Sequence, residues 1–157
     1  MRRHLICALM LLTFWPVLAG QTLDVPGYVD RAIRLFFSPD TTDAQCTDGL
    51  VSLLDAIVKA APAARIEGAW PAKVGAARER AAGGKMADAA GLLDQCYRAV
   101  HGKAFAVPAN VNSLNAARDH IRKQLSSVRD LMDQGRADEA VRRMLDAAMM
   151  IVTPIQG

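Results

Sequence analysis

The sequence lacks a marked excess of charge of either sign. Its 157 residues carry 19 lysines and arginines against 16 aspartates and glutamates, which gives a formal net charge of +3 at pH 7. A nucleic-acid-binding domain usually carries a marked basic excess that complements the phosphate backbone. The composition therefore gives no electrostatic basis for a nucleic-acid partner.

Long uncharged apolar runs are also missing, except near the start. There Arg2 and Arg3 precede an apolar run over residues 5–18, and Ala19 closes it. The run is shorter than the about 20 apolar residues of a membrane-spanning helix. A basic start, a short apolar core and a small final residue are typical of a secretory signal. We expect cleavage after Ala19, a single domain over residues 20–157 in the periplasm or outside the cell, and no stable membrane insertion.

Cysteine is scarce, and its placement is informative. Cys7 lies in the expected signal, which leaves only Cys46 and Cys96 in the exported domain. Each is spaced to share a helix face with leucines, Cys46 with Leu50 and Cys96 with Leu92. Because exported proteins fold in an oxidising compartment, we expect a disulfide that joins two packed helices. The alternative is a pair of buried free thiols that act as small hydrophobic side chains.

Apolar residues recur at helical spacing through most of residues 20–157, and no segment shows the alternation of a half-buried strand. We expect an all-α domain, a bundle of four to six helices in antiparallel hairpins. The segments that fit are about 26–37, 43–61, 70–82, 86–101, 113–134 and 137–152. The longest connection is then the segment 103–112.

Two of the expected turns have similar sequences. Gly84-Lys85-Met86-Ala87-Asp88-Ala89 and Gly135-Arg136-Ala137-Asp138-Glu139-Ala140 each stand between two helices. A glycine in the left-handed conformation ends one helix, and an acidic residue stabilises the first turn of the next. Over residues 74–100 and 125–152 these hairpins resemble those of tetratricopeptide repeats. That resemblance implies a protein-binding scaffold.

Residues with catalytic or metal-binding chemistry are few and scattered. The sequence contains no H-E-x-x-H, C-x-x-C-H, G-x-S-x-G or S-x-x-K motif. We therefore expect no enzyme activity, no metal and no cofactor, although an enzyme whose site does not show in linear motifs stays an alternative. Another alternative is a haem or copper site formed by His120, Met132 and Met144, because thioether and imidazole ligands suit these groups. Methionines on apolar helix faces are more often core residues.

Charged residues near the end of the sequence form pairs at helical spacing. Asp138 with Arg142, and Glu139 with Arg143, stand four residues apart. Such pairs are expected on a solvated helix face, where opposite charges four residues apart attract each other.

Two aromatic residues fall in expected loops or at their edges, Trp70 and Phe105. Aromatic side chains are enriched in protein interfaces, so these two are candidate partner contacts. The alternative is that each folds back to close an end of the bundle. Together with the hairpins, these features favour an exported, non-enzymatic domain that binds another envelope protein, as an adaptor, an inhibitor or an immunity-type partner. The alternative function is the periplasmic haem- or copper-binding bundle.

Overall fold

The computed structural model describes residues 23–154, which contain helices and no strand. The expected all-α class is confirmed, while the expected signal over residues 1–19 lies outside the described residues. The helices are α2 (Val25–Phe36), α3 (Asp43–Ala60), the 3-10 helix η1 (Ala61–Ala63), α4 (Trp70–Ala82), α5 (Met86–His101), α6 (Leu114–Ser126), α7 (Val128–Asp133) and α8 (Ala137–Val152).

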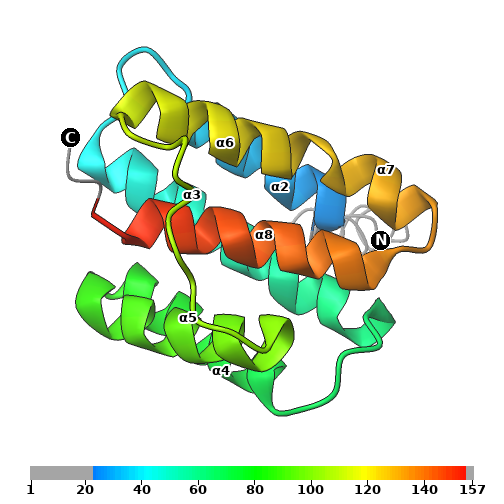
Figure 1. Ribbon diagram of the computed structural model, residues 1–157. Coiled ribbons are helices and arrows are strands. Elements are labelled where there is room, and N and C mark those ends of the chain that lie inside the picture. Colours follow the sequence, from blue (N-terminus) through cyan, green and yellow to red (C-terminus); the bar gives the residue numbers. More distant parts are fainter. Residues whose placement is uncertain (1–22, 155–157) are drawn as a thin grey trace, which may run out of the picture.

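Helix α8 is the central element of the bundle. It packs against α3, α5, α6 and α7, and Figure 1 shows it between the α4–α5 hairpin and α6. Helices α2 and α3 form another packed pair. The connection from α5 to α6 passes in front of α8 in this view. Because α8 is surrounded, its apolar side is almost wholly buried, including Met144, Leu145 and Ala148. None of the helices within residues 23–154 has both the length and the apolar character needed to cross a bilayer.

Local sequence signals fix several helix ends. The side chains of Asp24, Thr42 and Ser113 accept hydrogen bonds from backbone N–H groups in the first turns of α2, α3 and α6. Gly84 and Gly135 have φ angles of +76° and +71°, so both adopt the left-handed conformation predicted for the two similar turns. Each of these glycines is therefore the stop that separates an antiparallel pair of helices.

One expected helix is divided. The helical pattern over residues 113–134 continues past Ser127, but the structure ends α6 at Ser126 and begins α7 at Val128. The hydroxyl of Ser126 donates to the carbonyl of Lys123, and that of Ser127 donates to the carbonyl of Gln124. Serine hydroxyls that bond to the preceding turn compete with the helical backbone and often bend helices. The apolar spacing alone does not reveal this competition.

The structure does not support the expected disulfide between Cys46 and Cys96. Both thiols are free, Cys46 exposed and Cys96 buried. Cys46 lies in the first turn of α3, whereas burial along this helix begins at Gly49. Cys96 is 0% exposed, and its Sγ donates to the carbonyl oxygen of Trp70 at 3.6 Å. The spacing placed Cys46 on the apolar side of α3, but this turn lies beyond the part of the helix that other elements cover.

Candidate functional site

A pocket of about 430 Å³, lined by side chains with charged or polar groups, lies where α5, α6 and α8 meet. Helix α5 and the segment after it contribute Tyr97, His101 and Lys103, and α6 and α8 contribute the rest of the wall. We call it the α5–α6–α8 pocket. The remaining lining residues are His120, Lys123 and Gln124 of α6 and Arg142, Arg143 and Asp146 of α8.

One carboxylate in this pocket links two helices. The Nε2 atom of His120 lies 2.6 Å from Oδ2 of Asp146, and the side-chain amide of Gln124 donates to the same oxygen at 3.0 Å. The side chains of His120 and Asp146 are only 20% and 17% exposed. His120 and Gln124 are four residues apart and therefore lie on one side of α6. This contact holds that side of α6 against α8 through one oxygen of Asp146.

An aromatic wall forms the α5 side of the pocket. The rings of Tyr97 and His101 stack with centroids 3.8 Å apart and an interplanar angle of 13°. Phe105 packs its ring edge-on against Tyr97, at 5.3 Å between centroids. The Nδ1 atom of His101 lies 3.3 Å from the carbonyl oxygen of Tyr97. The imidazole is thus held by a stacked ring on one side and by a backbone carbonyl at one nitrogen.

The surroundings of the pocket shift the pKa values of His101 and Tyr97. Burial lowers the pKa of His101, and the positive charges of Arg142 and Lys103 lower it further, against the opposing effects of the Tyr97 carbonyl and Asp146. Burial raises the pKa of Tyr97, and the negative charge of Asp146 acts in the same direction. The positive potential of Arg142 and Lys103 therefore extends to the imidazole of His101.

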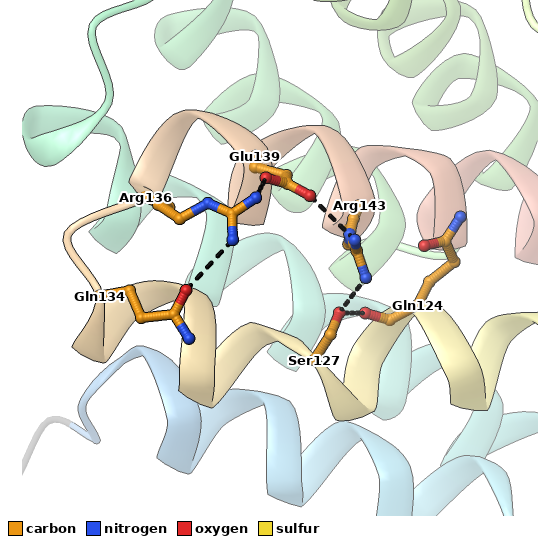
Figure 2. Close-up of polar contacts among 6 residues, drawn as sticks. All are labelled: Gln124, Ser127, Gln134, Arg136, Glu139 and Arg143. Carbon is orange, nitrogen blue, oxygen red and sulfur yellow. Dashed lines mark hydrogen bonds and ion pairs between the residues drawn. The ribbon is translucent and has the colours of Figure 1, made fainter.

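A hydrogen-bonded network holds Arg143, one of the side chains that line the pocket. Figure 2 shows Glu139 between two arginines, with Arg136 and Arg143 each donating to its carboxylate. These arginines lower the pKa of Glu139, with the hydrogen bond from Arg143 the largest cause. Arg143 also donates to the hydroxyl of Ser127 at 2.8 Å, and Arg136 donates to the side chain of Gln134. The expected pair of Glu139 and Arg143 is confirmed, and it ties α8 to the junction of α6 and α7.

The neighbouring expected pair does not form. Asp138 accepts a hydrogen bond of 2.5 Å from the backbone N–H of Arg65, in the segment after η1, instead of pairing with Arg142. Among the described residues, no carboxylate lies within ion-pairing distance of Arg142. The same is true of Lys103 and Lys123. The pocket thus holds cations whose charge is not neutralised within the described part of the chain, and it can attract a negatively charged group.

The residues singled out from the sequence are distributed as follows. His120 and Phe105 belong to the pocket and its wall, whereas Trp70 is 1% exposed and its indole N–H donates to the carbonyl of Ile66. Met144 is fully buried among apolar side chains, and Met132 is half-buried against the same core. No group of three or more histidine, cysteine, aspartate or glutamate side chains within residues 23–154 is arranged to hold a metal ion.

Sequence reasoning overlooked Asp146, Tyr97 and the unpaired cations as parts of one site. The available signals were the spacing of His120 with Gln124 and of Tyr97 with His101, which places each pair on one helix face.

Comparisons of the chain with protein-family models, with curated proteins and with solved structures find no match.

Proposed function

We propose that this protein is an exported, non-enzymatic helical domain that binds another protein of the cell envelope, as an adaptor, an inhibitor or an immunity-type partner. In this proposal residues 1–19 are a secretory signal cleaved after Ala19, and residues 20–157 act in the periplasm or outside the cell. The contact surface is the α5–α6–α8 pocket.

The observation that carries the proposal is the combination of unpaired cations with a fixed framework in this pocket. Asp146, His120 and Arg143 are already held by hydrogen bonds across helices, so the framework around the cations is formed before a partner binds. Lys103, Lys123 and Arg142 are exposed and available to a partner. Electrostatic complementarity of this kind accelerates encounter and selects among partners.

Site-specific photo-crosslinking tests the contact surface. The full chain is produced with a photoreactive amino acid at position 103, inside the pocket, or at position 59, where Lys59 is exposed on α3 and does not line the pocket. We expect one discrete crosslinked protein from position 103 that disappears when unlabelled protein competes. Position 59 serves as the control. Absence of a discrete product, or the same products from both positions, would count against the proposal.

The export part of the proposal has an independent test. The intact mass of protein recovered from the cell envelope should correspond to a chain that begins at Gly20, because the signal is removed on export. A chain that retains residues 1–19 and is found inside the cell would contradict export while leaving the fold unaffected.

A further inference from the structure

A second polar pocket adjoins the first along α8. It has a volume of about 440 Å³ and is lined by Ala63, Arg65, Gly135, Arg136, Asp138, Glu139 and Arg142. Arg142 lines both pockets, so they meet at this side chain. The second pocket also contains a cation from a distant part of the chain, since Arg65 lies between η1 and α4. We call the two pockets together the basic track.

The charges along the basic track do not cancel. Six lysine or arginine side chains line it, against the three carboxylates of Asp138, Glu139 and Asp146. Each of these carboxylates already accepts a hydrogen bond from this chain, Asp138 from the Arg65 backbone N–H, Glu139 from two arginines and Asp146 from α6. The guanidinium groups of Arg65 and Arg142 have no ion-pair partner among residues 23–154. Positive charge therefore remains for an external ligand.

The extent of the basic track distinguishes an extended ligand from a single small ion. Asp138, Arg142 and Asp146 follow one another at four-residue intervals on α8, and the helix rises 1.5 Å per residue, so the track follows α8 for about 12 Å. An extended chain covers about 3.3 Å per residue, so this length corresponds to about four residues of a bound segment.

We infer that the basic track binds a short acidic segment of the partner, whose side-chain carboxylates pair with Arg142 at the centre, with Lys103 or Lys123 on one side and with Arg65 on the other. This inference rests on the proposed function and specifies the chemistry of the partner. Arginine suits the central position because its planar guanidinium can donate two parallel hydrogen bonds to one carboxylate.

Peptide binding to the purified full chain tests the inference. The probe is a fluorescent peptide, blocked at both termini, with about four consecutive glutamates, the number that the length of the basic track suggests. A peptide with glutamine at the same positions is the control. We expect saturable binding of the glutamate peptide, weakened as ionic strength rises because salt screens exposed charges. Equal binding of the two peptides would overturn the inference.

Three variants locate the site. Arg142→Ala should weaken binding of the glutamate peptide by about tenfold or more, the effect of losing one charge-assisted pair. Arg65→Ala should also weaken it, because Arg65 lies in the second pocket. Arg34→Ala, which removes an exposed arginine of α2 outside the basic track, should leave binding unchanged. An Arg142→Ala variant that binds as tightly as the natural chain would refute the assignment. The native fold of each variant is confirmed by thermal unfolding.

Small anions test whether the ligand of the basic track is a free anion or an acidic segment of a protein. Succinate and inorganic phosphate carry the same oxyanion chemistry but do not extend along the track. We expect both to bind much more weakly than the glutamate peptide, with no dependence on Arg65. If either binds as tightly as the peptide, the ligand is a free small anion and the acidic-segment inference is wrong.

The two proposals can fail separately. If position 103 crosslinks a discrete partner and Arg142→Ala leaves that crosslink and peptide binding unchanged, protein binding stands and the acidic-segment inference falls. If the glutamate peptide binds with the expected dependence on Arg142 but no partner crosslinks in the envelope, the acidic-peptide site stands and the proposed function falls.

Discussion

The Nε2 atom of His120 on α6 lies 2.6 Å from Oδ2 of Asp146 on α8, and both side chains are largely shielded from solvent. The two residues are 26 positions apart in the sequence, so this contact forms only when the helices pack. Gln124 donates to the same carboxylate oxygen. Asp146 is therefore both a link between two helices and the one carboxylate among the described lining residues of a pocket that also holds two lysines and two arginines.

We predict that Asp146→Ala destabilises the fold. The substitution removes the acceptor shared by His120 and Gln124 and leaves both polar groups half-buried without their partner. Loss of such a hydrogen bond typically costs about 1–3 kcal/mol. Urea unfolding followed by circular dichroism measures the change. Arg142→Ala is the control, because the exposed Arg142 side chain has no ion-pair partner within the described residues. Equal stability of Asp146→Ala and the natural protein would show that the contact contributes nothing.

A double-mutant cycle isolates the contact itself. The double variant with His120→Ala and Asp146→Ala should lose less unfolding free energy than the two single variants lose in sum. The difference, the coupling energy, is about 0.5–3 kcal/mol for groups in direct contact. Additive costs would mean that the two side chains stabilise the fold independently.

The lowered pKa of His101 makes the stability of the fold depend on pH. Its pKa is lowered in the folded protein, chiefly by burial, so the unfolded chain takes up a proton at a higher pH than the folded one. The resulting stability is present above the unfolded pKa of about 6.5 and is lost as the pH falls through the folded pKa. We expect the melting temperature to fall between pH 7.5 and pH 5, and to fall less in His101→Gln. A His101→Gln variant with the same pH dependence as the natural protein would assign the effect to other groups.

The helices could be predicted from the sequence because their signals are local. Apolar spacing, capping side chains such as Ser113 and the left-handed glycines Gly84 and Gly135 act within a few residues of where they stand. The interruption at Ser127 was not visible in this pattern, because it depends on hydrogen bonds that the apolar spacing does not record. Apolar spacing also does not determine exposure, since Val58 stands four residues after the buried Leu54 on α3 and is 39% exposed.

The candidate site could not be predicted, because its parts come together only in the packed structure. Local spacing pairs Asp138 with Arg142, and an exposed pair of this kind contributes only about 0.3–0.5 kcal/mol. The backbone N–H of Arg65 instead donates to Asp138 from 73 residues away. A charge-assisted bond to a backbone donor is the stronger interaction. This exchange of partners leaves Arg142 available, and no local pattern reveals it.

The two described cysteines should differ sharply in reactivity. In a Cys7→Ser background, we expect Cys46 to react rapidly with a thiol reagent at pH 8, because it is exposed. Cys96 should react only after unfolding, since it is 0% exposed and burial raises its pKa to about 11, which disfavours the reactive thiolate. Quantitative labelling of the unreduced, unfolded chain should find both thiols. Finding neither would restore the Cys46–Cys96 disulfide and refute the structure at this point.

A pair of glycine substitutions tests the packing of α2 on α3. A Cβ atom added at Gly49 would lie 3.0 Å from the Phe36 ring, closer than most Cβ contacts in proteins. Because the Phe36 ring and the α3 backbone would have to move apart, we predict that Gly49→Ala costs about 1–3 kcal/mol of unfolding free energy, as overpacking does elsewhere.

Gly91 provides the matched control, since it is exposed inside α5 and a Cβ atom there meets nothing within 4 Å. Gly91→Ala should stabilise the protein by about 0.5–1 kcal/mol, because alanine favours the helical backbone and glycine disfavours it. Urea unfolding of the two variants should therefore shift in opposite directions. If Gly49→Ala is stabilising as well, the Phe36 ring yields to the added methyl group at little cost, and the overpacking prediction is wrong.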